Sequence, residues 1–369
     1  MCEGDGMEEW KECKLKDICD YGKDRTEVSS LDNSTYISTE NMLPNRAGIT
    51  TATTLPTGEY TPSFELNDTL FSNIRPYFKK IWKATFSGGC SADVLVFKAK
   101  ENISKDYLYY VLADDEFFKY SMATSKGTKM PRGDKVSIME YPIKLPPLPT
   151  QQKIAAILSS LDDKIELNNK INTNLEQQAQ AFFKNWFVDF EPFGGKMPEG
   201  WKVGKLSDVA DITSGKRPPM KQSDYSKDVS IPLVGAASVM GYTNQVLYNE
   251  PILITGRVGT HGVIQRFSTE CWPSDNTLVI KSKYYEYVYQ IMSNIDYDNM
   301  NRGSTQPLIT QSDLGKVECI IPDEENLNKF EKLTNSLFAK VQESLRENQK
   351  LIDIRDTLLP KLMSGEINL

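Results

Sequence analysis

An internal duplication is the feature that most constrains how this chain can fold. Residues 10–20 align without gaps on residues 201–211 and share six of eleven positions, including the pair Trp10 and Trp201. Further matches follow in the same order: residues 91–100 with 274–283, 107–109 with 287–289, Gly127, Thr128 and Pro131 with Gly303, Ser304 and Pro307, and 145–146 with 321–322. A repeat of this kind defines the units within which every motif is interpreted. We therefore expect two copies of one structural unit in tandem.

Each copy consists of a mixed segment followed by a long helical pattern. The mixed segments are rich in Gly, Pro, Thr and Tyr and contain short runs typical of β-strands, such as residues 93–97 and 277–280. We predict an α+β protein in which two β-rich globular domains in tandem repeat are joined by two long helices. The expected boundaries are 1–150 for the first domain, 151–190 for the central helix, 191–326 for the second domain, with residues 191–200 as its linker, and 327–369 for the C-terminal helix.

Apolar residues in both predicted helices recur at alternating spacings of four and three, which is the pattern of a coiled coil. The first helix has Ile154, Leu158, Leu161, Ile165, Leu175, Ala179, Phe182 and Trp186 at its seam positions. The second has Phe330, Leu337, Val341, Leu351, Leu358 and Leu362, with Thr334 and Arg355 interrupting the seam. A helix of about 40 residues is about 60 Å long.

Both helices interrupt the apolar seam at the same layer, near the middle. Asn168 and Asn172 of the first helix correspond to Ser344 and Asn348 of the second. Polar seam residues cost stability but fix the register of a coiled coil. An antiparallel pair would bring the four residues together, so we predict an antiparallel coiled coil. The alternative is that these residues lie on a solvated face and each helix packs on its own domain.

An antiparallel helix pair has a geometric consequence for function. It would hold two similar domains apart at a fixed separation, related by an approximate twofold axis. Duplex DNA offers a ligand of matching symmetry, because its grooves recur about every 34–36 Å. The pattern therefore predicts a protein that measures the spacing between two half-sites.

The distribution of charge supports a nucleic-acid ligand, although the formal net charge is −7. Basic residues alternate with aromatic ones between Asp68 and Asp93, where no acidic residue occurs, and a second stretch without acids lies between Glu250 and Glu270. We predict DNA contacts by Arg75, Lys79, Lys80, Lys83, Lys126, Lys129 and Arg132 in the first copy, and by Lys216, Arg217, Lys221, Arg257, His261, Arg266, Arg302 and Gln306 in the second. For any single residue, a solvated surface charge is the alternative.

Motifs for catalysis are missing from the sequence. It contains neither the [DN]PP[YF] tetrapeptide of amino-methyltransferases nor a GxxxxGK[ST] phosphate loop, and residues 256–262 only superficially resemble a phosphate cradle. His261 is the single histidine, and the six cysteines include no CxxC pair, so we expect no metal site, no disulfides and no bound cofactor. The acidic start and the lack of a long apolar stretch predict a cytoplasmic protein without a membrane segment.

Taken together, these residues resemble the specificity subunit of a type I restriction-modification system. The resemblance lies in the two Trp-Lys-x-x-x-Leu-x-Asp motifs, the Gly-Thr/Ser-x-x-x-Pro motifs, residues 145–154 (LPPLPTQQKI) and residues 358–367 (LLPKLMSGEI). The second copy departs from the pattern at residues 321–327, which lack the second Pro and the Gln pair. The boundary of the second helix is therefore less well defined by this motif.

The resemblance implies a subunit without catalytic activity. Each β-rich domain would be a target recognition domain that binds one half of a bipartite, asymmetric site in double-stranded DNA. The helices would act as the spacer and bind two methyltransferase subunits, which bind S-adenosylmethionine and methylate adenine, and motor-nuclease subunits would complete the restriction enzyme. Two alternatives are a duplicated scaffold that binds proteins and a self-contained DNA-modifying enzyme.

Overall fold

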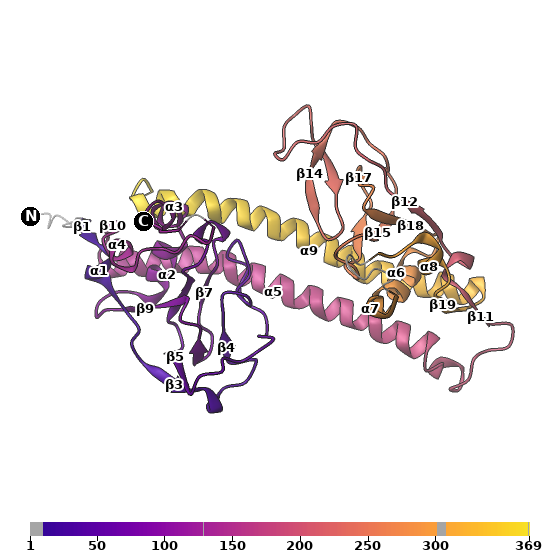
Figure 1. Cartoon of the computed structure of the whole chain (residues 1–369), viewed down its shortest axis with the longest axis horizontal. Helices are drawn as coiled ribbons and strands as arrows, with labels where there is room; N and C mark the ends of the chain where they lie inside the picture. The colour runs from indigo at the N-terminus through magenta and orange to yellow at the C-terminus, as the bar shows by residue number, and fades with distance from the viewer. Residues whose placement is uncertain (1–9, 128, 301–307, 368) are drawn as a thin grey trace, which may run out of the picture. The chain divides into compact units, whose positions relative to one another are not determined.

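The computed structural model describes residues 10–127, 129–300, 308–367 and 369, and it divides into two compact units (Figure 1). The first unit is Met1–Asn168 with Arg346–Leu369, and the second is Asn169–Leu345. Each unit therefore contains one β-rich domain and one half of each long helix.

The first domain is built on two small sheets. A central antiparallel sheet has the order β2 (Cys19–Tyr21), β9 (Val94–Ala99), β6 (Thr69–Ser72) and β7 (Ile81–Lys83), and a second sheet has the order β3 (Arg25–Glu27), β5 (Tyr60–Phe64), β8 (Gly88–Cys90) and β4 (Tyr36–Ile37). Strand β1 (Lys11–Lys14) pairs with β10 (Pro142–Leu145). The residues of β6 and the first four of β9 are buried, which explains why their sequences are continuous apolar or small runs.

Short helices cover the first domain. They are α1 (Leu15–Ile18), α2 (Lys105–Ala113), α3 (Asp115–Ala123) and α4 (Lys135–Met139), with 3-10 turns η1 (Val28–Ser30) and η2 (Pro76–Phe78). Ser104, Asp114 and Asp134 cap α2, α3 and α4 by accepting hydrogen bonds from backbone N–H groups of the first turn. The apolar faces of these helices share one core with the beginning of one long helix and the end of the other.

The second domain repeats this construction. Its central antiparallel sheet has the order β12 (Asp211–Ser214), β18 (Thr277–Lys281), β15 (Ile252–Gly256) and β16 (Gln265–Phe267), and a smaller sheet has the order β14 (Val239–Thr243), β13 (Ile231–Val234) and β17 (Trp272–Pro273). Strand β11 (Lys202–Lys205) pairs with β19 (Glu318–Ile321). The remaining elements are α6 (Tyr285–Ser293), α7 (Tyr297–Met300), α8 (Gln311–Gly315), η3 (Glu191–Phe193) and η4 (Leu206–Asp208).

The structure confirms the tandem repeat and explains its first motif. The central sheets have the same strand order, because β2, β9, β6 and β7 correspond to β12, β18, β15 and β16. In both copies the Asp of the motif accepts a hydrogen bond from the backbone N–H three residues earlier, from Lys14 to Asp17 (2.8 Å) and from Lys205 to Asp208 (2.9 Å). The motif leucines, Leu15 and Leu206, are fully buried. The motif therefore encodes a turn that inserts one leucine into each core.

The two long helices are α5 (Leu148–Phe187) and α9 (Glu324–Ser364). Each begins three residues before the position expected from the sequence, and α5 also ends three residues earlier. Pro149 fits the first turn of α5, where no backbone N–H is needed for the helix. At the start of α9, Asp323 accepts a hydrogen bond from Asn326 N (2.8 Å), so an aspartate cap replaces the motif that is missing from the second copy.

Contacts within each unit confirm the predicted antiparallel coiled coil. In the first unit, Ile154 and Leu158 share a core with Leu359 and Leu362, whereas Asn168 contacts Asn348. In the second unit, Ala179 packs with Phe338 and Val341, and the rings of Phe187 and Phe330 lie 5.1 Å apart. Residues nearer the C-terminus of α5 therefore contact residues nearer the N-terminus of α9, as in an antiparallel pair.

The two residues that interrupt the seam of α9 are both satisfied internally. Thr334 is fully buried and donates from Oγ1 to Phe330 O at 2.8 Å. Arg355 donates from Nη1 to Asp162 Oδ1 of α5 at 2.8 Å, and Tyr110 OH donates to the other oxygen of the same carboxylate. Arg355 thus replaces an apolar seam contact with an ion pair between the helices.

Candidate nucleic-acid interface

A short turn after β6 carries the first group of predicted DNA contacts. Arg75 and Lys79 flank η2, and both adopt left-handed backbone conformations, with φ of 50° and 52°. Such conformations cost about 1–3 kcal/mol in residues other than glycine and cluster where a protein positions functional groups. Tyr77 and Phe78 between them are exposed, with their rings 4.7 Å apart. The turn therefore displays an aromatic pair between two basic residues.

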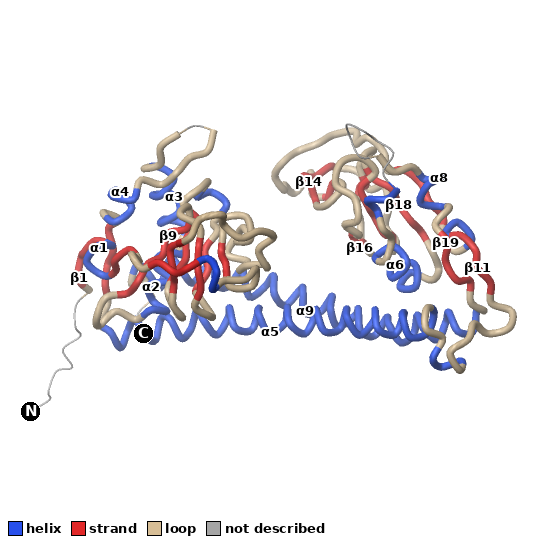
Figure 2. Tube along the Cα trace, turned by 60° about the horizontal axis from the view of Figure 1, so that its bottom comes forward, coloured by secondary structure: helices blue, strands red, loops and turns tan. Residues whose placement is uncertain are grey.

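A second segment of the first domain lies beside this turn. Arg75 N donates to Pro131 O (2.8 Å), and Ile74 forms a β-bridge with Arg132. Arg132 is also bridged to Lys126, which closes the base of the loop between α3 and α4. Within this unit, the loop lies on the side of the domain away from α5 (Figure 2). The predicted contacts of the turn and the loop therefore share one surface.

Most of the predicted basic contacts in the first domain have acidic partners. The ion pairs are Lys79 with Asp115 (2.8 Å), Lys83 with Asp106 (2.7 Å), Lys126 with Asp134, and Arg132 with Asp93 (3.0 Å). Lys80 donates to Thr39 O (2.6 Å), and Lys129 is exposed. The hydrogen bond from Lys126 holds the pKa of Asp134 well below its usual range. Because exposed ion pairs contribute little net stability, a DNA phosphate can replace these carboxylates.

In the second domain, three predicted contacts lie on the segment that follows β12. Lys216, Arg217 and Lys221 are exposed, and none of them forms an ion pair with a residue that the structure describes. The start of the segment is anchored, because Lys216 N donates to Pro273 O (2.9 Å) and Trp272 Nε1 donates to Lys216 O (2.8 Å). The three cations are therefore held on an anchored backbone, with their charges available to an anionic ligand.

The loop between β15 and β16 carries Arg257 and His261, which are both partly buried. Glycine is required at position 256, because a Cβ there would lie 1.9 Å from Thr260 O. His261 Nδ1 lies 3.2 Å from Gly256 O, a contact that ties the loop back onto its own start. The two other predicted contacts of this copy, Arg302 and Gln306, lie outside the described residues.

Equivalent segments come together in both domains. Ile74 bridges Arg132 in the first, and Val258 bridges Leu308 in the second. In each case a residue just beyond β6 or β15 pairs with the segment that follows the Gly-Thr/Ser motif of the repeat. Both copies therefore build the candidate interface from the same parts of the fold, although the side chains differ.

The structure places the predicted contact Arg266 beside α6. This side chain is only 16% exposed, and it forms an ion pair with Glu286 in the first turn of α6. Lys83 has a similar place in the first copy, on strand β7, and pairs with Asp106 in the first turn of α2. These contacts favour a structural role for Arg266 over a DNA contact. The sequence shows its charge but gives no sign of the partner carboxylate.

Sequence reasoning missed the β13–β14 hairpin. Val239 and Met240 near its turn are exposed, and within this unit the hairpin projects away from α9 (Figure 1). Gln265 Nε2 donates to Gly235 O (2.8 Å), which places the turn of the hairpin beside the β15–β16 loop. A signal for it was available, because residues 229–249 contain no charged side chain.

The polar layer of the long helices is buried. Asn168, Asn172, Ser344 and Asn348 are at most 7% exposed. In the first unit, Asn168 Nδ2 donates to Asn348 Oδ1 and to Glu347 Oε2, both at 2.8 Å. In the second unit, the amide of Asn172 has no hydrogen-bond partner among the described residues. The layer therefore carries a cost in stability, as expected of seam residues that select a register.

The described part of the chain holds no group of three or more His, Cys, Asp and Glu side chains that could bind a metal ion. None of its helices is long and apolar enough to span a bilayer. The five described cysteines are free, and burial raises the pKa of Cys19 and Cys90 to about 12.

The protein consists of two domains of equivalent construction that are joined to one antiparallel helix pair, and each domain carries basic residues on its loops. These features define a duplicated nucleic-acid recognition protein. Residues 7–177 and 198–347 match the family described as the type I restriction modification DNA specificity domain. The chain is 29% identical over 306 residues to the type I restriction enzyme MjaIX specificity subunit of Methanocaldococcus jannaschii, covering 73% of this chain and 70% of that one. It is 26% identical to the HindI specificity subunit of Haemophilus influenzae, covering 98% and 100% of the two chains.

The fold is also similar to a solved structure. The crystal structure of the type I restriction-modification S subunit from M. genitalium matches with a TM-score of 0.58 and 15% identity, covering 98% of both chains. The chain belongs to the type I restriction-modification DNA specificity family. It is a specificity subunit, in which two tandem domains recognise DNA sequence, and catalysis lies on other subunits.

Proposed function

We propose that each domain of this specificity subunit binds one half of a bipartite, asymmetric site in double-stranded DNA. The observation that carries the proposal is the repeated pairing of segments, Ile74 with Arg132 and Val258 with Leu308, which builds one basic surface per domain. The site is asymmetric because the equivalent surfaces carry different side chains. DNA affinity comes mainly from phosphate contacts, whereas the differing loops select the bases.

The proposed contact set follows from the geometry. In the first domain it comprises Arg75, Lys79, Lys80, Lys126, Lys129 and Arg132, with Lys83 at its margin because of its ion pair with Asp106. In the second domain it comprises Lys216, Arg217, Lys221, Arg257 and His261, to which we add the exposed Val239 and Met240. Arg302 and Gln306 remain proposed from the sequence. Apolar side chains contribute to base recognition by contacting the 5-methyl group of thymine.

We also propose that α5 and α9 set the spacing between the two half-sites. The two helices are continuous over 40 and 41 residues. Each residue added to or removed from such a helix changes its length by about 1.5 Å. The polar layer of Asn168, Asn172, Ser344 and Asn348 would fix the register in which the helices pair. A register shift would change the spacer, so the same residues would secure the length of the recognised site.

The partners proposed for the chain follow from its family. Two methyltransferase subunits, which bind S-adenosylmethionine, would assemble with it and methylate adenine, and motor-nuclease subunits would complete the restriction enzyme. The chain itself would hold no cofactor and would act in the cytoplasm, where the DNA is accessible. A protein-binding scaffold would differ from this account in one respect, because its binding to DNA would not depend on sequence.

Methylation mapping tests the proposal directly. Genomic DNA from cells that express this chain with its methyltransferase is sequenced for modified adenines, and duplexes containing the mapped site are then titrated with the purified complex. We expect one bipartite asymmetric motif and a loss of affinity when either half is scrambled. A complex that binds scrambled and mapped duplexes equally would contradict the proposal and favour a scaffold.

A further inference from the structure

A partly buried arginine lies where the second domain meets the coiled coil within its own unit. Arg266 belongs to β16 and pairs with Leu253 of β15. The Cζ of its guanidinium lies 3.7 Å from the ring centre of Phe338, 4.5 Å from that of Tyr289 and 5.1 Å from that of Tyr285. Phe338 belongs to α9, whereas the tyrosines belong to α6. One side chain therefore joins the sheet, the domain helix and the spacer helix.

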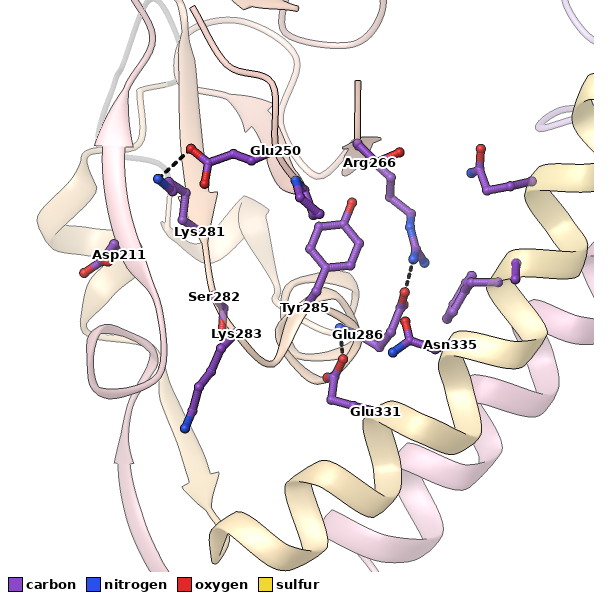
Figure 3. A pocket seen from close by; sticks show the side chains of 15 residues that line it. Asp211, Glu250, Arg266, Lys281, Ser282, Lys283, Tyr285, Glu286, Glu331 and Asn335 are labelled. Atoms are coloured by element: carbon purple, nitrogen blue, oxygen red, sulfur yellow. Dashed lines mark hydrogen bonds and ion pairs between the residues drawn. The ribbon is translucent and has the colours of Figure 1, made fainter. Parts of the chain in front are cut away.

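The same guanidinium is held by charge as well as by stacking. Nη2 of Arg266 pairs with Oε1 of Glu286, whose side chain is 3% exposed. Glu286 lies between Arg266 and Glu331 in Figure 3, and Glu331 of α9 accepts hydrogen bonds from Glu286 N (3.2 Å) and Tyr287 N (2.8 Å). The start of α6 is thus fixed to α9 twice, through its backbone by Glu331 and through Arg266 by Phe338.

Stability alone does not account for this arrangement. Arg266 Nη1 and Glu286 Oε2 are buried without a hydrogen-bond partner among the described residues. Apolar replacements for a buried ion pair are often neutral or stabilising, since desolvation offsets much of the attraction. A planar guanidinium, however, can stack on rings and pair with a carboxylate at once, which fixes its orientation. The arrangement therefore favours defined geometry over maximum stability.

Arg266 lies at the base of a loop that we propose to contact DNA. Strands β15 and β16 form a hairpin whose connecting loop, residues 257–264, carries Arg257 and His261. We propose that Arg266 is a positioning residue, which ties this hairpin to α9 and so holds Arg257 and His261 in place for the second half-site. The inference rests on the proposed function, because it assumes that this loop contacts DNA.

The first domain offers a matched control. Lys83 lies on the corresponding strand β7 and pairs with Asp106 in the first turn of α2 (2.7 Å). Its side chain is 30% exposed, Asp106 is 47% exposed, and none of the cation–ring contacts found among the described residues involves Lys83. A surface pair of this kind is easily replaced by solvent. Lys83 therefore has the same place in the repeat as Arg266 but lacks the ring contacts and the buried carboxylate partner.

The test uses the complex of the full chain with its methyltransferase and the duplex identified by methylation mapping. The variants are Arg266→Met, Arg266→Lys and the control Lys83→Met. Arg266 lines a cavity of about 710 Å³, so neither replacement is forced into a clash. Urea unfolding establishes that each variant is folded, and affinities are measured for the mapped duplex and for duplexes altered in either half-site.

We expect Arg266→Met to unfold cooperatively and to bind the mapped duplex about tenfold more weakly, the size of one lost specific contact. The lost affinity should come from contacts with the second half-site. Changing the bases of the second half should therefore reduce the affinity of the variant less than that of the wild type, whereas changing the first half should reduce both affinities equally. Arg266→Lys should restore part of the affinity, since it keeps the cation. Lys83→Met should leave discrimination in the second half unchanged.

Other outcomes separate the two claims. A folded Arg266→Met variant with wild-type affinity and wild-type discrimination would overturn the inference and leave the proposed function intact. A wild-type complex without sequence preference would instead overturn the proposed function. If Arg266→Met fails to fold, Phe338→Leu takes its place, because it removes the ring that joins Arg266 to α9. Wild-type discrimination by a folded Phe338→Leu variant would equally overturn the inference.

Discussion

Asn168 of α5 donates a hydrogen bond from Nδ2 to Oδ1 of Asn348 of α9, over 2.8 Å, in the buried seam of the first unit. These residues lie 180 positions apart in the chain and meet at the layer where both helices carry polar side chains in the seam. An amide pair in this position is satisfied in one register of the helices and left unsatisfied in shifted ones.

Replacing one partner of this pair should cost more than replacing both. We expect Asn168→Leu to lower the free energy of unfolding by about 1–3 kcal/mol, because the buried hydrogen bond from Asn168 to Asn348 is lost. The double variant Asn168→Leu/Asn348→Leu should recover most of this loss, since an apolar layer needs no partner. Urea unfolding of the wild type, of the single variants Asn168→Leu and Asn348→Leu and of the double variant gives the coupling energy. Strictly additive effects would show that the two amides do not interact.

Charge removal on the second domain should change how DNA binding depends on salt. Replacing both Lys216 and Arg217 by Gln should reduce the slope of log K against log salt by about 2, because about 0.9 counterion is released per phosphate contact. The loss should be similar for specific and scrambled duplexes. Lys329→Gln on α9, where Lys329 pairs with Glu325, serves as the control and should keep the wild-type slope. An unchanged slope in the double variant would remove this segment from the interface.

Substitutions in the β13–β14 hairpin should weaken DNA binding without changing its dependence on salt. Val239 and Met240 carry no charge, so Met240→Ser should weaken binding to the mapped duplex and leave the salt slope unchanged. If the hairpin contacts a thymine methyl group, replacing that thymine by uracil should weaken the wild type and have little effect on the variant. Titrations of duplexes with single uracil substitutions provide the measurement. Equal sensitivity of wild type and variant at every position would exclude methyl recognition by Met240.

Glu331 should make the stability of the second unit depend on pH. Burial, reinforced by the neighbouring charge of Glu286, raises the pKa of Glu331 from 4.5 to about 7. Between these values the folded chain binds a proton that the unfolded chain lacks, so the free energy of unfolding falls as pH rises, by up to about 1.4 kcal/mol per pH unit.

Removing this carboxylate should flatten the profile. Glu331→Gln does not titrate, so its stability should fall less than that of the wild type between pH 5 and pH 7.5 in urea unfolding. Glu325→Gln, on the exposed side of the same helix, should retain the wild-type fall. Parallel profiles for Glu331→Gln and the wild type would mean that Glu331 is not the titrating group.

The helices were predictable because their signal is local. The seven-residue spacing is written directly into α5 and α9, and the antiparallel direction followed from the coincidence of Asn168 and Asn172 with Ser344 and Asn348. The first turns were not predicted at the right residues. Their limits depend on Pro149 and on the Asp323 cap, which a heptad pattern does not report.

The candidate interface was predictable only as a set of charges. Sequence reasoning identified Arg266 as basic, but its partners Glu286 and Phe338 lie 20 and 72 positions further along the chain and are brought to it by the fold. The same limit applies to the β13–β14 hairpin, where Val239 and Met240 resemble interior residues until the strand pairing shows that they are exposed. Tertiary contacts, not composition, decide which polar groups remain available.

The central claim is that α5 and α9 set the distance between two half-sites that the domains recognise independently. The most direct measurement is the methylated motif of a chain with one heptad added to each helix, after Asn172 in α5 and before Ser344 in α9. Seven residues add about 10 Å of helix, or about three base pairs at 3.4 Å each. The account predicts the same two half-sites with a spacer about three base pairs longer. The same motif with its original spacer, methylated as efficiently as before, would contradict it.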